Sequence, residues 1–205
     1  MNRINNVTSQ KHINLLPEVL VAPAAVWQLN NILTESGVIV IDSAAEPDAF
    51  TFISDKQIVL VGTFGDDATI TWNDWLCKIG ATFIPVRSAG SHFLIGPLAG
   101  MATNVCLHDL KIQTELNGFN SHFATTMEFD SASAGNLFPA LAAFGQTHTP
   151  DDLLYKIFAI AFDGSVIAQS RAARFPYDEV CRAPLPPRQI HYAKQLIPHE
   201  SKLAQ

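Results

Sequence analysis

Three separated side chains have the spacing of metal ligands. Cys106 and Asp109 stand three positions apart, and Cys181 stands three positions before Pro184. Structural zinc is held by four ligands, commonly from two C-x-x-C turns that meet in space. The spacing predicts a degenerate zinc site with Cys106, Asp109 and Cys181 as its ligands, because proline cannot bind a metal. The alternative, which we favour, is a lost zinc site repacked with ordinary side chains.

A cysteine–histidine pair for nucleophilic catalysis is a further hypothesis. Cys106 stands close in sequence to His108 and His122, and such a pair needs the two side chains within hydrogen-bond reach. The sequence contains no P-loop, no G-x-S-x-G motif and no H-E-x-x-H motif. We therefore expect no catalytic residue in this chain.

The turn after the first predicted strand is where a nucleotide would bind. A dinucleotide site needs glycines there, so that the backbone can approach the phosphates at a helix N-terminus. The turn reads Ala22-Pro23-Ala24-Ala25, and Pro23 lacks an N–H donor. Asp42 ends the next predicted strand, at the position of a ribose-binding acid. Between a dinucleotide site and a Rossmann-like unit without one, we expect the second, and no cofactor.

Alternating apolar strands and amphipathic helices position these residues. Strands are predicted at 18–21, 38–42, 57–64, 81–87, 92–97 and 165–175. Helices are predicted at 22–37, 71–80, 104–118, 136–145 and 149–162, with 128–136 as a loop. Thr71 and Thr149 are the expected N-caps of their helices. The pattern predicts an α/β fold, with a Rossmann-like, mainly parallel sheet and an α+β C-terminal half.

Trp72 and Trp75 have two interpretations. As exposed residues they would be anchors of a protein interface. As buried residues they would pack a helix on the sheet. Leu76 and Ile79 fall on the same helical face, which favours the core over the interface.

Composition bounds the class of protein. The chain has 205 residues, 48% of them hydrophobic, and a formal net charge of −6. This acidic balance argues against a nucleic-acid partner. No apolar run reaches the ~18 residues of a membrane helix, and residues 1–12 do not form a secretory signal, so we expect a cytoplasmic protein. We divide it into a polar tail (1–17), one α/β domain (18–184) and a Pro-rich tail (185–205).

Two motifs carry a resemblance to a known family. They are Ile95-Gly96-Pro97-Leu98, followed by Gly100 and Cys106, and Arg174-Phe175-Pro176 before Cys181. Together with the order of the predicted elements, they resemble the ubiquitin-activating-enzyme-like (ThiF-like) domain of proteins that assist YcaO cyclodehydratases. Those complexes make thiazoles and oxazoles in ribosomal peptides, including bacteriocins. The resemblance covers about residues 18–184.

The resemblance implies a scaffold that docks on a YcaO enzyme, which binds the ATP and acts on a precursor peptide. It also implies four zinc cysteines, two of which are replaced here by Asp109 and Pro184. The family's leader-binding winged helix has no room before residue 18, so we do not expect this chain to bind a leader alone. Two alternatives stay open: a small adenylating enzyme with a divergent phosphate loop, and a homodimeric ligand-binding or regulatory domain.

Overall fold

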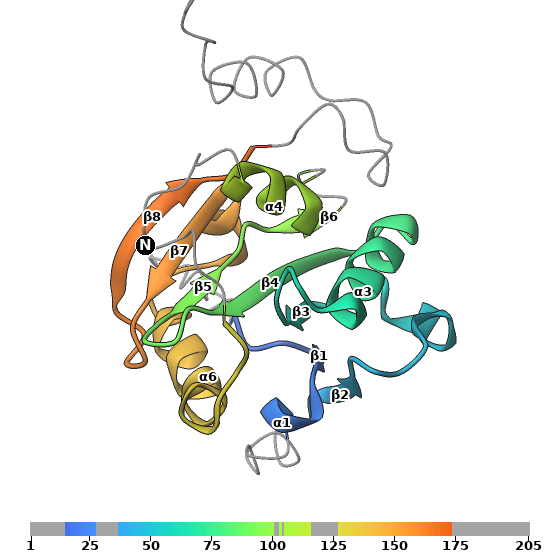
Figure 1. The fold of residues 1–205 in the computed structure, drawn as a ribbon, viewed down its shortest axis with the longest axis horizontal. Coiled ribbons are helices and arrows are strands. Elements are labelled where there is room, and N and C mark those ends of the chain that lie inside the picture. Colours follow the sequence, from blue (N-terminus) through green and yellow to red (C-terminus); the bar gives the residue numbers. More distant parts are fainter. Residues whose placement is uncertain (1–14, 28–36, 101–102, 104, 116–126, 174–205) are drawn as a thin grey trace, which may run out of the picture.

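An eight-stranded sheet forms the centre of the fold (Figure 1). The computed structural model describes residues 15–27, 37–100, 103, 105–115 and 127–173. The strands are β1 (Val19–Ala22), β2 (Ile39–Asp42), β3 (Ile58–Val61), β4 (Thr82–Ser88), β5 (Phe93–Ile95), β6 (Ala99–Gly100), β7 (Lys156–Ile160) and β8 (Val166–Arg171). Their order is β2-β1-β3-β4-β5-β7-β8, and β6 pairs with β4.

The sheet changes character at β4. The pairs β1–β2, β1–β3 and β3–β4 are parallel, and every later pair is antiparallel. All four residues of both β1 and β3 are buried, as expected of parallel strands covered on both faces. The predicted α/β fold is confirmed, and its C-terminal half adds antiparallel strands to the same sheet.

Helices cover the two faces of the sheet and build two hydrophobic clusters. On one face lie α3 (Asp67–Lys78), α4 (Leu107–Glu115) and the 3₁₀ helix η1 (Pro47–Ile53), whose apolar residues share a cluster with Val21, Leu60 and Phe83. The other face carries α1 (Ala24–Trp27) and α6 (Ser131–Phe144), which pack on Val59 and Val86. Both faces of the central strands are thereby removed from water.

Helix α3 begins earlier than predicted. Its N-cap is Asp66, whose carboxylate accepts hydrogen bonds from the backbone N–H groups of Ala68 and Thr69 and from the Thr69 hydroxyl. Thr71 lies inside the helix instead, where its hydroxyl donates to the Asp67 carbonyl at 2.8 Å. The predicted cap was wrong because Asp66 offers two acceptor oxygens one turn earlier.

Helix α6 occupies much of the predicted loop at 128–136. Its cap is Asp130, which accepts hydrogen bonds from both the backbone N–H and the hydroxyl of Ser133, each at 2.7 Å. Pro139 lies inside the helix and leaves the carbonyl of Gly135 without an intrahelical donor. Gly135 is exposed, so that carbonyl can bind water. The loop prediction was therefore wrong from Ser131 onward.

The helix predicted at 149–162 is also wrong. Thr149 and Asp152 do form a capping box, but it starts only the short 3₁₀ helix η2 (Pro150–Leu153). Tyr155 then takes a positive φ of 56°, and the chain enters β7. This strand pairs with β5 on one side and β8 on the other, so tertiary pairing overrides the local helix signal.

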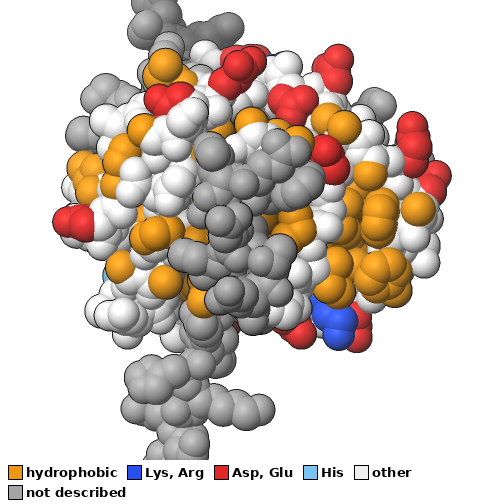
Figure 2. Space-filling model, turned by 90° about the horizontal axis from the view of Figure 1, so that it is seen from below, with side chains coloured by type: hydrophobic (Ala, Val, Ile, Leu, Met, Phe, Trp, Pro, Cys, Tyr) orange, Lys and Arg blue, Asp and Glu red, His pale blue; other side chains and the backbone are white. Residues whose placement is uncertain are grey.

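The surface described is predominantly neutral and acidic. On the face shown in Figure 2, Asp and Glu side chains lie around the rim, and Lys and Arg side chains are scarce. Within the described ranges, no helix combines the length and the apolar character needed to cross a bilayer.

Candidate functional site

A cavity of about 750 Å³ opens at the carboxyl ends of the parallel strands. Its walls come from the segments that follow β1, β2 and β3, and from Glu128 and Phe129 before α6. In open α/β sheets, ligands bind beyond the carboxyl ends of the strands. The volume also lies within the range of small-molecule pockets, roughly 300–1,000 Å³. This cavity is the candidate site.

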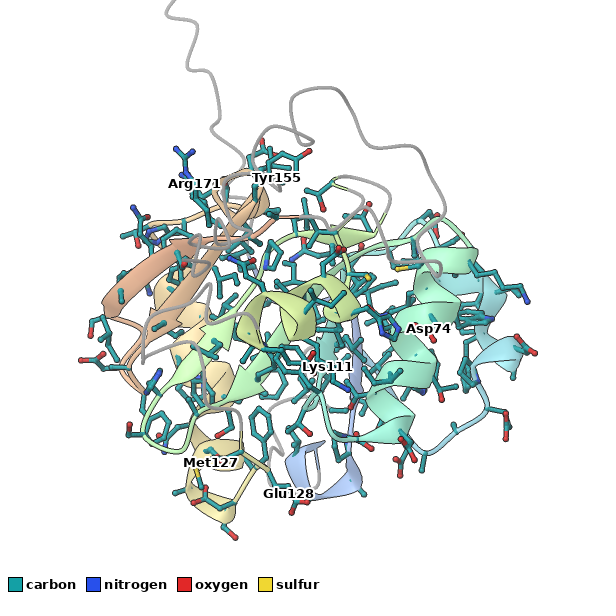
Figure 3. All side chains as sticks on the ribbon, turned by 45° about the horizontal axis from the view of Figure 1, so that its top comes forward. Asp74, Lys111, Met127, Glu128, Tyr155 and Arg171 are labelled. Atoms are coloured by element: carbon teal, nitrogen blue, oxygen red, sulfur yellow. The ribbon has the colours of Figure 1, made fainter. Side chains whose placement is uncertain are left out.

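Four carboxylates line the cavity. They are Asp42, Asp66, Asp67 and Glu128, and the described lining residues include no Lys or Arg. Glu128 lies next to α1, at the bottom of the view in Figure 3. Its segment is held to the sheet because Met127 forms an isolated bridge with Ser88 at the end of β4. The cavity therefore favours cations and hydroxyl groups over phosphates.

Two of these carboxylates are already engaged in the local backbone. Asp42 ends β2 as predicted, and its Oδ1 accepts a hydrogen bond from the Ala44 N–H at 2.9 Å. Asp66 caps α3 through three donors. A helix N-terminus that already holds a carboxylate has less positive potential for a bound phosphate.

The turn after β1 keeps the Rossmann geometry without its phosphate contacts. β1 ends at Ala22, and α1 begins at Ala24. Pro23 supplies no N–H, and its carbonyl accepts a hydrogen bond from Val26 at 2.9 Å. Pro23, Ala24 and Ala25 all line the cavity, at the turn where a dinucleotide site needs glycine.

The predicted metal ligands lie elsewhere, at the start of α4. Cys106 is buried there, and its backbone N–H donates to Asp109 Oδ2 at 3.0 Å. Asp109 is also buried, and by accepting this hydrogen bond its carboxylate caps the start of α4. Cys181 lies outside the described residues. Within the described ranges, no cluster of three or more His, Cys, Asp or Glu side chains could hold a metal.

Of the residues in the predicted cysteine–histidine pair, the structure describes Cys106 and His108 but not His122. His108 Nε2 lies 2.7 Å from Asp74 Oδ1, which joins α4 to α3; the α3 position of Asp74 is marked in Figure 3. The Asn73 side chain supports the same junction by donating to Asp74 at 2.9 Å and accepting from the Leu107 N–H at 2.9 Å. His122 lies outside the described residues. The contacts of His108 seen here therefore join two helices.

Trp72 and Trp75 lie in the core between α3 and the sheet. Their exposed fractions are 0% and 7%. The rings meet edge to face with centroids 5.6 Å apart, and the Trp72 indole donates to the Ser43 carbonyl at 2.9 Å. Ser43 directly follows β2 and lines the cavity, so this hydrogen bond holds one wall of the cavity against α3.

Sequence reasoning missed two features of this region. Asp66 could have been found, because an acidic residue before an amphipathic run is a helix-start signal. Glu128 could not, since it reaches the cavity only through the bridge between Met127 and Ser88.

The fold resembles solved structures of a heterocyclase and of a microcin synthetase complex. The heterocyclase TruD matches with a TM-score of 0.50 and 17% sequence identity, over 83% of this chain and 28% of TruD. A chain of the E. coli microcin synthetase McbBCD complex matches with a TM-score of 0.51 and 14% identity, over 84% of this chain and 70% of that one. At these identities the likeness establishes the fold alone. No protein-family profile and no curated protein sequence matches the chain.

Proposed function

We propose that this chain is a non-catalytic partner subunit of a complex that forms heterocycles in ribosomally made peptides. In this role it assists a YcaO-type ATP-dependent cyclodehydratase, which carries out the chemistry on a precursor peptide. The chain spans 28% of the length of TruD, so the activity of such a whole enzyme is not carried over to it. What it supplies is a scaffold and a binding surface.

One observation carries the proposal. The chain shares its fold with TruD and with a chain of McbBCD, but its cavity has Pro23 in the phosphate turn and four carboxylates in its walls. A nucleoside triphosphate carries several negative charges, and like charges at a few ångströms repel. The acidic lining disfavours a bound triphosphate, which supports a role in which this chain acts together with another protein that binds ATP.

The direct test is to purify the tagged chain from its native host and to identify bound proteins by mass spectrometry. Co-purification of a YcaO-type enzyme, together with a short precursor peptide, is the expected result. A chain that elutes alone, as a monomer or homodimer, would contradict the partner role. That outcome would instead support the ligand-binding or regulatory alternative.

A second candidate is a small nucleotide-dependent enzyme. The observation that favours it is Asp42 at the end of β2, in a cavity of about 750 Å³ at the carboxyl edge of the sheet. It predicts ATP binding and ATP–pyrophosphate exchange by the purified chain. Calorimetry with saturating ATP and magnesium separates the two functions, because the partner proposal predicts neither activity.

A further inference from the structure

Arg87 is a buried cation without a described partner. It stands next to the last residue of β4, and strand alternation places its side chain on the same face of the sheet as Phe83, toward α3 and α4. Its exposed fraction is 1%. Among the residues that the structure describes, none accepts a hydrogen bond from Nε, Nη1 or Nη2. Buried polar groups in proteins are almost always paired, so this guanidinium requires an explanation.

The described contact of the guanidinium is with an aromatic ring. Its Cζ lies 4.5 Å from the ring centroid of Phe64, within the range of a cation–π interaction. A cation–π contact satisfies none of the N–H donors of the guanidinium, so all three nitrogen atoms are left without an acceptor among the described residues.

Arg87 remains charged at neutral pH despite its burial. Burial lowers its pKa from the ordinary arginine value to about 9, and no carboxylate in the described part of the chain counters this effect. A guanidinium with that pKa is still protonated at pH 7. Leaving such a charge buried and unpaired is strongly destabilising, whereas a carboxylate placed on the donor fork would restore the lost hydrogen bonds.

We propose that Arg87 is the anchor of a carboxylate that belongs to another molecule. The guanidinium fork matches a carboxylate in shape and can bind it through two parallel hydrogen bonds. A single carboxylate also balances the single positive charge. A phosphate would bring additional negative charge to an apolar face, beside a loop whose other side carries Asp66 and Asp67.

The loop between β3 and α3 separates this anchor from the cavity. Gly62, Thr63, Gly65 and Asp66 line the cavity, whereas Phe64 does not and stacks on Arg87 instead. The ring of Phe64 is only half-buried, so it can turn away from Arg87 without leaving the core. When this ring swings away, the guanidinium has space to turn its N–H donors toward an incoming carboxylate.

Thermal unfolding of the full chain with small anions tests the proposal. The probes are acetate, an N-acetylated tri-alanine peptide with a free C-terminus, its C-terminally amidated form, and inorganic phosphate, all at one ionic strength set with chloride. Saturation to about 100 times Kd should raise Tm by roughly 5 °C or more. We expect this rise with acetate or the free peptide, and none with the amidated peptide. A response to the peptide alone identifies a peptide carboxylate, and a response to both identifies a general carboxylate site.

Variants decide whether the response comes from Arg87. Arg87→Met should abolish the rise and, without added carboxylate, should have a Tm equal to or above that of the wild type, because it removes an unpaired buried charge. Arg87→Lys should keep a weaker rise, since lysine offers a point charge without the fork. Arg171→Met is the matched control, because Arg171 is exposed on β8, and it should respond as the wild type does.

Three results would overturn the proposal. One is an equal response of wild type and Arg87→Met, which would make the effect a general property of the solution. Another is a rise with phosphate that exceeds the rise with any carboxylate. The third is no rise with any probe at saturating concentration, which would mean that no carboxylate of another molecule binds at Arg87.

Discussion

Single residues in this protein fix how closely α3 approaches the sheet. Gly62 follows β3 and faces α3, and a Cβ atom added there would lie 2.7 Å from Thr69 Cβ and 2.6 Å from Thr69 Cγ2. Real Cβ atoms do not approach other carbon atoms this closely. The missing side chain at Gly62 therefore sets the depth at which α3 packs.

Gly62→Ala should lower the free energy of unfolding by about 1–3 kcal/mol, because it overpacks this contact. Adding Thr69→Ala should recover part of the loss, since it removes Oγ1 and Cγ2 from the clash. Gly65→Ala is the control, because an added Cβ there meets nothing within 4 Å. Urea unfolding measures all three variants. Equal stability of Gly62→Ala and Gly65→Ala would show that the contact is not limiting.

The stability of the fold at acidic pH depends in part on Asp152, in the capping box of η2. The Thr149 backbone N–H donates to Asp152 at 2.8 Å and the Thr149 hydroxyl donates at 3.0 Å, and these bonds lower the pKa of Asp152. A carboxyl with a lowered folded-state pKa stabilises the fold above its unfolded-state pKa. That contribution is lost as the pH falls through the folded-state value.

The difference in free energy of unfolding between wild type and Asp152→Asn should thus stay constant from pH 7 to about 5 and shrink below about pH 4. Chemical unfolding across this pH range measures it. Asp151→Asn, at an exposed neighbouring position, should show a much smaller pH dependence. A difference for Asp152→Asn that does not change with pH would contradict the role of the ionised carboxyl.

Among single residues, those fixed by a local sequence pattern could be predicted, and those fixed by tertiary contacts could not. Asp42 could be placed at a strand end from the pattern VIVID, because an apolar run followed by an acid is a local signal, even though the strand is not buried as predicted and only Ile41 lies in the core. Arg87 could not be recognised as buried, since arginine is rarely inside proteins and its contact with Phe64 forms only when the ends of β3 and β4 lie side by side. Cys106 and Asp109 do lie together, but through a hydrogen bond that caps a helix.

At the scale of elements, α4 is fastened to the last strand by one side chain. The Gln113 amide donates to the Arg171 carbonyl at 2.9 Å and accepts from the Ala173 N–H at 3.2 Å. Gln113 is buried, so water cannot replace these bonds. Arg171 and Tyr155 lie together at this end of the β7–β8 pair (Figure 3), and the Ala172 N–H donates to the Tyr155 carbonyl at 2.9 Å.

Gln113→Leu should cost about 1–3 kcal/mol of stability, because it leaves two backbone groups unsatisfied. Amide hydrogen exchange at Ala173 should become faster in the variant, while exchange in β1 and β3 follows only the global change. Gln169→Leu, at an exposed position on β8, is the matched control. Unchanged exchange at Ala173 would show that the end of β8 is held by other contacts.

Elements were predictable where the local pattern and the tertiary environment agree. The strands at 38–42, 57–64, 81–87 and 92–97 were found because they are apolar runs bounded by turn residues, although within β2 only Ile41 is buried. The segment after Thr149 failed because its helix-start signals are real but extend only to Leu153. The conformation of the next residues is decided by pairing with β5 and β8, of which β5 lies far away in sequence. Similarly, the Asp130–Ser133 cap of α6 stands in a stretch whose composition is typical of a loop.

The whole molecule combines a Rossmann-like half with an antiparallel extension. The parallel half places a cavity at its carboxyl edge, and the acidic walls of that cavity match the net charge of −6. The antiparallel half buries β5 and β7 and leaves β8 at the edge of the sheet. A nucleotide enzyme would need basic groups at the cavity or a glycine-rich turn after β1, and the described lining has neither a Lys or Arg nor a glycine in that turn, so the proposed division of labour gives ATP to a partner and the scaffold to this chain.

Reconstitution of the modification reaction tests this central claim most directly. The purified chain, the YcaO-type enzyme of its host and the precursor peptide would be combined with ATP and magnesium, and peptide mass would report the loss of one water for each heterocycle formed. We predict no mass change with this chain alone and a faster change when it is added to the enzyme. Modification by the chain alone, or an enzyme rate unaffected by the chain, would contradict the account.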